Sequence, residues 1–169
     1  MNLPTAALLI IRERKLLLAY SRNKCCFYLP GGKIDEGESS ASALCREIAE
    51  EMKVTIEEHE LDYYTHISAP AYGEKNGTMM EQDCFFLRRN IIPEAAAEIG
   101  ELKYFSLKEY LSQTNQAPGA IKILEQLQNE GLIDWSFVVF AYLNHWIEST
   151  ASVLLYSCIH DWLLSLDFL

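Results

Sequence analysis

Residues 29–54 read LPGGKIDEGESSASALCREIAEEMKV, a stretch in which two adjacent glycines are followed by six acidic residues before the apolar pattern resumes. Glu47, Glu50 and Glu51 are spaced i, i+3 and i+4, which places them on one face of an α-helix. Clustered carboxylates repel one another unless a cation lies among them, and ligands that offer only oxygen suit Mg²⁺ or Mn²⁺ better than zinc. The stretch therefore predicts a site for a hard divalent metal ion.

The same stretch predicts a short strand, a glycine loop and a helix in succession. The strand spans 27–29 and leads into Pro30-Gly31-Gly32, where glycine permits positive φ and lets a ligand approach the backbone closely. The helix spans 40–52, and its acidic face lies at the edge of the core. Its buried stripe consists of Ala41, Leu44, Cys45, Ile48 and Met52.

Apolar runs, alternation and turn residues predict the remaining elements. The first two strands, 5–11 and 15–20, flank the tripeptide Arg12-Glu13-Arg14 and are expected to form a hairpin. Later strands are expected at 54–57, 61–70, 79–87 and 101–105, with loops at 73–78 and 88–100. Ser106 and Glu109 form a capping box for a short helix ending near Leu111, and a last helix with Ile121, Leu124 and Leu127 inside runs over 118–130 to Gly131. This order favours an α/β or α+β sandwich over a repeat protein.

Length and charge limit the classes of function. A chain of 169 residues suits one domain with an extension. Its formal charge of −10 leaves no basic face for polymeric nucleic acid, and a small anionic substrate would need metal to bridge its charge. The five cysteines are odd in number and lack a CxxC pair, which argues against a disulfide framework or zinc site and fits a reducing cytoplasm.

The C-terminal extension, residues 135–169, differs in character from the domain at 1–134. From residue 136 it is mostly apolar, contains no lysine or arginine, and has Glu148, Asp161 and Asp167 as its only charges. His145 and Glu148 interrupt the apolar run, so no clean stretch of about 20 apolar residues remains to span a bilayer. We therefore favour a helical hairpin that packs on the domain or on a second copy, as in a homodimer, over a membrane anchor.

Gly32, Glu38 and the run from Arg46 to Val54 carry a resemblance to a known family. Their spacing resembles the Nudix box, G-x5-E-x7-R-E-U-x-E-E-x-G-U, and eight of its nine specified positions agree. The resemblance implies the Nudix α/β/α sandwich with a mixed central sheet over 1–134, and it does not extend to the tail. Lys53 stands where the family has glycine, and a lysine forced into the left-handed conformation costs about 1 kcal/mol.

The resemblance also implies a reaction, in which water attacks a phosphorus of a nucleoside diphosphate derivative with a divalent metal bridging enzyme and diphosphate. Its metal ligands would be Glu47, Glu50 and Glu51, helped by the Gly32 carbonyl, with Mg²⁺ the expected ion and Mn²⁺ the alternative. A box carboxylate would take the proton of the attacking water. Arg46 would orient a carboxylate and Glu38 would brace the turn. The plain alternative is a solvated acidic helix face.

Outside the box, single residues are matched by their neighbouring strands. Glu98 resembles an additional loop glutamate near the metals, with Glu101 as its competitor. Lys33 and Arg22 would flank the glycine loop and contact substrate phosphates. Asn115 resembles the asparagine that MutT-like members use to read a purine edge, because an amide pairs a donor with an acceptor, although loop asparagines also cap turns.

Five further residues are weighed against plain packing roles. Pro70 and Tyr72 lie where Nudix subfamilies carry a substrate-marking proline or tyrosine, and the presence of both leaves this signal ambiguous. Tyr63, Tyr64 and His66 are read first as strand residues that pack with polar tips at the rim.

The spelling LPGGK resembles the MutT-like branch and favours a nucleoside triphosphate or related nucleotide as substrate. ADP-ribose or a dinucleoside polyphosphate is the alternative substrate. An alternative from another class is a non-catalytic nucleotide-binding sensor or interaction module. The discriminating feature is the intact set of box carboxylates, which favours the enzyme.

Overall fold

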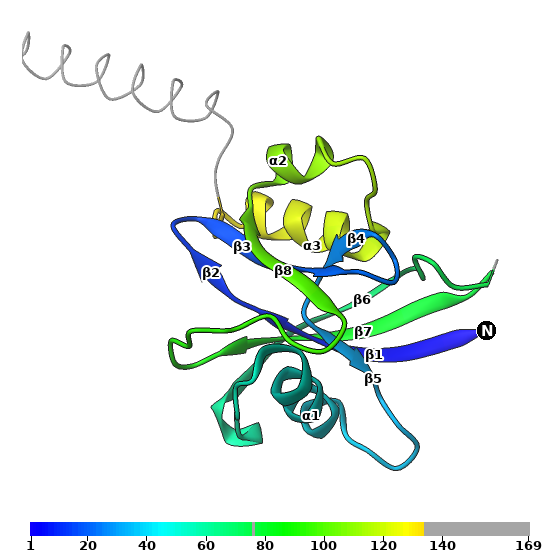
Figure 1. Cartoon of the computed structure of the whole chain (residues 1–169), viewed down its shortest axis with the longest axis vertical. Helices are drawn as coiled ribbons and strands as arrows, with labels where there is room; N and C mark the ends of the chain where they lie inside the picture. The colour runs from blue at the N-terminus through cyan, green and yellow to red at the C-terminus, as the bar shows by residue number, and fades with distance from the viewer. Residues whose placement is uncertain (76, 134–169) are drawn as a thin grey trace, which may run out of the picture. The chain divides into compact units, whose positions relative to one another are not determined.

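A computed structural model of the chain describes residues 1–75 and 77–133 (Figure 1). The predictions for residues 135–169 fall outside the described residues, so the helical extension, its packing and the domain boundary stay predictions. No helix within 1–75 and 77–133 is long and apolar enough to cross a bilayer.

A mixed sheet of four strands forms one part of the domain, in the order β5-β1-β7-β6. Strand β1 (Asn2–Leu9) runs parallel to β7 (Met79–Leu87), and β7 is antiparallel to β6 (Leu61–Pro70). Strand β5 (Gly31–Lys33) pairs antiparallel with the middle of β1. The predicted strands at 61–70 and 79–87 are confirmed, because alternating and apolar residues specify both.

A second sheet is built around β3 (Lys15–Ser21), which pairs antiparallel with each of its neighbours. They are β2 (Ile11–Arg12), β4 (Cys26–Tyr28) and β8 (Ile99–Phe105). The predicted hairpin forms between β2 and β3, with Glu13 and Arg14 at φ 48° and 60° in the turn. The expectation that the first long strand takes part in it is wrong, because β1 lies in the other sheet and only the short β2 continues into the turn.

Helices cover both faces of this β layer, as Figure 1 shows: α1 (Ser40–Met52) on one side and α2 (Leu107–Leu111) with α3 (Pro118–Asn129) on the other. Alternate residues of β1 serve the two sides. Ala6 and Leu8 pack with the core residues of α1, whereas Ala7 and Leu9 pack with those of α3. A strand buried on both faces needs a continuous apolar run, which explains the sequence of β1. The predicted α/β/α sandwich is confirmed.

Helix α1 carries the acidic face and has the predicted bounds. It begins after Ser39, whose side chain accepts a hydrogen bond from the backbone N–H of Ser42 at 3.0 Å. Leu44, Ile48 and Met52 are fully buried. The helix ends at Lys53, which has the left-handed conformation, φ 53° and ψ 31°, that the glycine of the Nudix box would adopt without strain.

Lys53→Gly should raise the free energy of unfolding by about 0.5 kcal/mol. Relief of the left-handed strain contributes about 1 kcal/mol, and the larger backbone entropy of glycine in the unfolded chain offsets about half of it. The lost ion pair to Glu94, 3.7 Å long between two exposed side chains, contributes little. Urea denaturation of both proteins measures the difference, and a destabilised variant would show that lysine is not strained there.

Two further expectations about elements are wrong. Residues 54–57 form no strand; a 3₁₀ turn, Glu58–Glu60, follows them, and Glu57 and Glu60 cap its backbone reciprocally. Gly31–Lys33 is a strand and not a loop. A Cβ at Gly31, where φ is 128°, would lie 2.2 Å from the carbonyl oxygen of Ala6, so only glycine permits this close pairing with β1.

A buried tyrosine of α2, Tyr110, holds the start of α3 in place. The capping box of Ser106 and Glu109 forms as predicted and begins α2. The hydroxyl of Tyr110 donates to the Phe27 carbonyl at 2.6 Å and accepts from the Ala117 N–H at 2.8 Å. In α3 the predicted Leu124 and Leu127 are buried together with Ile123, whereas the predicted Ile121 is only half-buried. These bonds fix the start of α3 beside β4.

Candidate active site

A pocket of about 300 Å³ opens beside the glycines of β5. Strands β1, β5 and β7, helix α1, the start of α3 and the loops after β3 and β6 supply its walls. Polar and charged wall residues, tyrosines apart, are Thr5, Ser21, Asn23, Lys24, Lys33, Glu47, Glu51, Glu74, Gln82 and Glu98. Apolar side chains include Leu3, Leu29, Pro70, Met80, Ala117, Pro118 and Ala120. The pocket thus has a charged part at α1 and an apolar part at α3.

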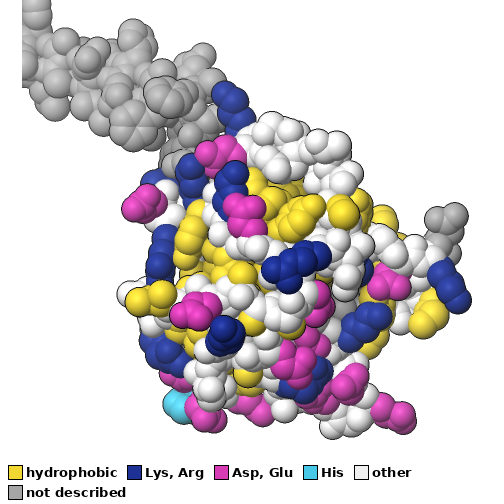
Figure 2. All heavy atoms as spheres, viewed as in Figure 1, with side chains coloured by type: hydrophobic (Ala, Val, Ile, Leu, Met, Phe, Trp, Pro, Cys, Tyr) yellow, Lys and Arg dark blue, Asp and Glu magenta, His cyan; other side chains and the backbone are white. Residues whose placement is uncertain are grey.

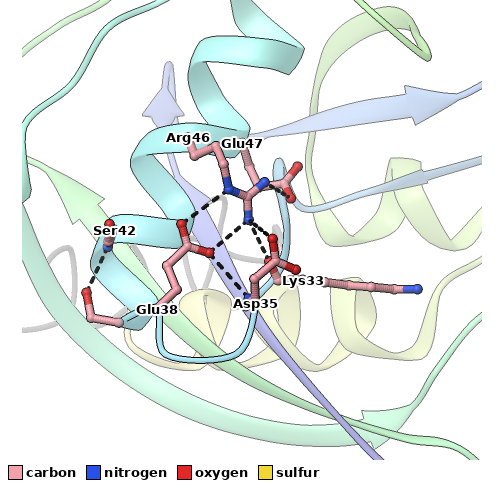
Figure 3. Close-up of polar contacts among 7 residues, drawn as sticks. Lys33, Asp35, Glu38, Ser42, Arg46 and Glu47 are labelled. Carbon is pink, nitrogen blue, oxygen red and sulfur yellow. Dashed lines mark hydrogen bonds and ion pairs between the residues drawn. The ribbon is translucent and has the colours of Figure 1, made fainter.

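Arg46 lies at the centre of a polar network between β5 and α1 (Figure 3). Its Nε and Nη2 atoms donate to both carboxylate oxygens of Glu38 at 3.2 and 3.0 Å. Its Nη1 atom donates to Glu47 at 2.8 Å, and Nη2 also reaches the Lys33 carbonyl at 3.1 Å. The hydrogen bonds from Arg46 lower the pKa of Glu38. Arg46 and Glu38 therefore have the geometry of a brace that orients Glu47 and holds the turn after β5.

The carboxylate of Glu47 lies directly against the backbone of Gly32. A Cβ on Gly32 would meet the Glu47 carboxylate carbon at 2.3 Å and its oxygens at 2.5 and 2.6 Å. Any side chain at position 32 would therefore displace this carboxylate. Gly32 does not have a positive φ angle, so glycine is not needed there for its backbone conformation. The absence of a side chain instead allows the Glu47 carboxylate to approach the backbone closely.

Glu51 is a buried acid at the same corner, only 4% exposed. One of its oxygens accepts the Gly31 N–H at 3.0 Å. Burial, helped by the nearby carboxylates of Glu47, Glu98 and Glu50, raises the pKa of Glu51 to about 8 against the lowering effect of the Gly31 bond. An acid that is buried among acids is favoured in its ionised form only if a cation joins it, so the donor set suits a hard divalent ion.

The other predicted metal ligands lie in different settings. Glu98 lines the pocket from the loop before β8, whereas its competitor Glu101 is exposed and outside the lining. Glu50 is exposed on α1 and also outside the lining. Within residues 1–75 and 77–133, no three acidic, histidine or cysteine side chains already lie in a metal-holding arrangement. The structure thus brings Gly32, Glu47, Glu51 and Glu98 to one pocket.

Of the predicted phosphate contacts, Lys33 faces the pocket and Arg22 does not. Lys33 Nζ lies 3.7 Å from a Glu74 oxygen, and Lys24 Nζ lies 3.3 Å from the same oxygen. Arg22 instead donates to the Ala97 carbonyl at 3.1 Å outside the lining. Sequence reasoning missed Lys24 and Glu74, whose loops meet only in the folded chain.

Asn115 lies outside the pocket lining and is exposed. Its amide nitrogen donates to the Cys25 carbonyl at 2.9 Å, a bond that ties the loop before α3 to the loop before β4. Gln82 and Thr5, which sequence reasoning missed, are buried polar wall residues. The signal that could have found them is a polar residue at an inward position of an otherwise apolar strand.

The aromatic and histidine residues divide between pocket and surface. Tyr72 and Pro70 line the pocket, and Tyr63 is exposed. His66 is exposed on β6, where its ring nitrogens bond to Asp83 at 2.8 Å and Glu81 at 3.0 Å, and these bonds raise its pKa. On the face in Figure 2, Lys and Arg side chains are interspersed with Asp and Glu side chains.

Comparison with known proteins relates this chain to Nudix hydrolases. The model of the NUDIX domain matches residues 1–127. No curated protein matches the chain. Among solved structures, a MutT NUDIX hydrolase from Burkholderia pseudomallei shares 22% identity with a TM-score of 0.61, over 75% of this chain and 98% of that one. The E. coli ORF135 protein shares 25% identity with a TM-score of 0.57, over 73% and 86%.

A third structure comes from a protein with a second activity. It is a bifunctional NMN adenylyltransferase/ADP ribose pyrophosphatase from Francisella tularensis, complexed with AMP and a Mn ion. It shares 20% identity with a TM-score of 0.54, over 77% of this chain and 42% of that one. Because the family model spans most of the chain and the fold and box agree with it, this chain belongs to the Nudix family of pyrophosphohydrolases, which cleave diphosphate linkages in nucleoside derivatives.

Proposed function

We propose that this enzyme hydrolyses a diphosphate linkage of a nucleoside triphosphate or a related nucleotide in a Mg²⁺-dependent reaction. The observation that carries the proposal is the corner where the backbone of Gly32, the carboxylate of Glu47 and the buried carboxylate of Glu51 meet. Lys33 and Lys24 line the same pocket and supply positive charge for the phosphates. An acidic corner beside two lysines suits a metal-bridged polyphosphate and no uncharged substrate.

In this mechanism Glu47, Glu51 and Glu98 would hold the metal together with the Gly32 carbonyl, and the exposed Glu50 would join them from α1. When bound, Mg²⁺ or Mn²⁺ neutralises phosphoryl charge and lowers the pKa of water. Arg46 keeps Glu47 in one orientation through its 2.8 Å bond. A box carboxylate accepts the proton of the attacking water, and Lys33 and Lys24 hold the phosphates in place for attack on phosphorus.

ADP-ribose is the second candidate substrate. The fold shared with the Francisella tularensis protein, which is named as an ADP ribose pyrophosphatase and holds AMP and Mn, favours testing it. Triphosphates remain the leading substrates because LPGGK resembles the MutT-like branch.

A panel of nucleoside triphosphates, ADP-ribose and dinucleoside polyphosphates, each assayed with Mg²⁺, tests the substrate class. We expect turnover of at least one triphosphate to a monophosphate and diphosphate, with ADP-ribose slower. A clear preference for ADP-ribose over every triphosphate would end the leading assignment. Turnover that persists with excess chelator would contradict the metal dependence.

Glu74→Gln should lower the KM for the nucleotide about threefold. The half-buried Glu74 holds Lys24 and Lys33 in ion pairs at the pocket surface worth a few tenths to 1 kcal/mol, and phosphates must displace it to reach them. The control is Glu94→Gln, which removes the same charge from an exposed 3.7 Å pair with Lys53 outside the pocket lining. An increase in KM for the Glu74 variant, or an equal effect of both substitutions, would show that Glu74 does not compete with phosphate.

A further inference from the structure

Gln82 interrupts an apolar strand at the pocket wall. In the sheet it is the direct partner of Thr5 on β1 and of Ile67 on β6. The next inward row along the same strands pairs Met80 with Leu3 and Ala69. Because side chains two residues apart share a face, Gln82 and Met80 point toward the same side of the sheet, the side that carries α3.

The Gln82 side chain is buried yet unpartnered. It is 6% exposed, and its amide makes no hydrogen bond to any side chain or backbone group within residues 1–75 and 77–133. Within residues 1–75 and 77–133, the one side-chain nitrogen or oxygen that is fully enclosed and lacks a hydrogen bond is the Tyr104 hydroxyl. The Gln82 amide is therefore not fully enclosed, and it keeps access to the pocket that it lines. An amide that has no partner in the protein and faces the pocket is available to a ligand, and matched hydrogen bonds in a closed pocket are worth more than those it makes to solvent.

Apolar residues line the pocket wall next to Gln82. Leu3 and Met80 lie in the neighbouring row, and Pro70 and Tyr72 close the wall after β6. A Cβ on Gly119 would lie 2.5 Å from the Met80 methyl group, so the methionine lies against the start of α3. An apolar wall that carries an amide is the setting that binds a planar ring and fixes its orientation.

The same sheet row links this apolar part to the phosphate part. Lys33 on β5 pairs with Thr5, and Thr5 pairs with Gln82, so one strand separates the lysine from the glutamine. Neighbouring strands lie about 4.8 Å apart, which places the two backbones about 10 Å apart. This span suits a nucleotide whose phosphates lie at Lys33 and whose base lies at Gln82.

We propose that Gln82 is the specificity-determining residue of the pocket and reads the edge of the nucleobase. Its amide offers an acceptor beside a donor, which is complementary to a base edge with the same pair of groups. The inference rests on the proposed function only in taking the ligand to be a nucleotide. It assigns base reading to Gln82, whereas the amide of Asn115 is engaged with the Cys25 carbonyl outside the lining.

Equilibrium binding of the four nucleoside monophosphates tests this inference without requiring turnover. Isothermal titration calorimetry on the full-length chain would compare wild type, Gln82→Leu and Gln82→Glu. We expect wild type to prefer one or two bases, and Gln82→Leu to weaken binding of the preferred one about tenfold or more and to level the four affinities. Gln82→Glu keeps the shape but replaces the donor, so it should change the order of the bases.

Gln113→Leu is the matched control, because Gln113 lies outside the pocket lining and should leave base preference unchanged. If both Gln82→Leu and Gln82→Glu bind the preferred base as tightly as wild type does, Gln82 does not read the base. Hydrolysis of the triphosphates is measured in parallel. Base-selective binding that depends on Gln82, without hydrolysis, would contradict the proposed function and support the role of Gln82. Hydrolysis with a base preference that the Gln82 variants do not alter would support the proposed function and contradict the role of Gln82. Absence of nucleotide binding would contradict both.

Discussion

Glu51→Gln is expected to lower kcat/KM for the nucleotide about a thousandfold. Glutamine keeps the shape and can still accept the Gly31 N–H, but it removes the buried charge that a divalent ion would neutralise. Loss of metal-based stabilisation of phosphoryl charge amounts to several kcal/mol in the transition state. Steady-state hydrolysis at saturating Mg²⁺ measures the change.

Folding of this variant should be intact, because an amide is less costly to bury than a carboxylate whose pKa is raised to about 8. The metal-free variant should therefore be at least as resistant to urea as wild type. Glu36→Gln is the matched control, since Glu36 is exposed in the loop between β5 and α1 and lies outside the pocket lining. A Glu51→Gln enzyme with more than about a tenth of wild-type activity would remove Glu51 from the metal site.

Gly32→Ala should lower kcat about a hundredfold with a smaller effect on KM. The added methyl group would lie 2.3 Å from the Glu47 carboxylate carbon, so Glu47 must move away from its position beside Arg46. Displacement of a positioned catalytic group by about 1 Å is sufficient for a loss of this size. Steady-state kinetics with circular dichroism of the variant separates this effect from misfolding.

Gly37→Ala is the control for a glycine substitution in the same segment. Nothing lies within 4 Å of a Cβ there, although φ is +85°, so the variant should lose about 1 kcal/mol of stability and keep its activity. Equal kinetics of Gly32→Ala and wild type would show that the Glu47 position is not critical. A loss in both variants would point to the segment and not to Glu47.

Elements with strong local signals could be predicted from the sequence. Helix α1 has a serine cap, an apolar stripe and an identifiable end, and the structure places it where these signals do. Strand β5 could not be predicted, because its glycines carry no strand signal and it exists through pairing with β1. Residues 54–57 alternate like a strand, but without a pairing partner the alternation alone does not make one.

The site divides in the same way. The box fixes Gly32, Arg46 and Glu47 by their spacing within one loop and helix, so their proximity follows from local geometry. Residues on distant segments depend on the sheet register, which no local pattern reveals. Gln82 and Lys24 therefore escaped notice, and Asn115, matched by its neighbours, bonds to the Cys25 carbonyl outside the pocket lining.

Hydrolysis of the preferred nucleotide in ¹⁸O-labelled water, with Mg²⁺ titrated from zero, tests the central claim most directly. If the corner of Gly32, Glu47 and Glu51 holds a metal for water attack on phosphorus, turnover should rise from the chelated baseline and saturate with Mg²⁺, and ¹⁸O should appear in one phosphate product. Turnover that is independent of divalent metal, or products in which no phosphate carries the label, would contradict the account.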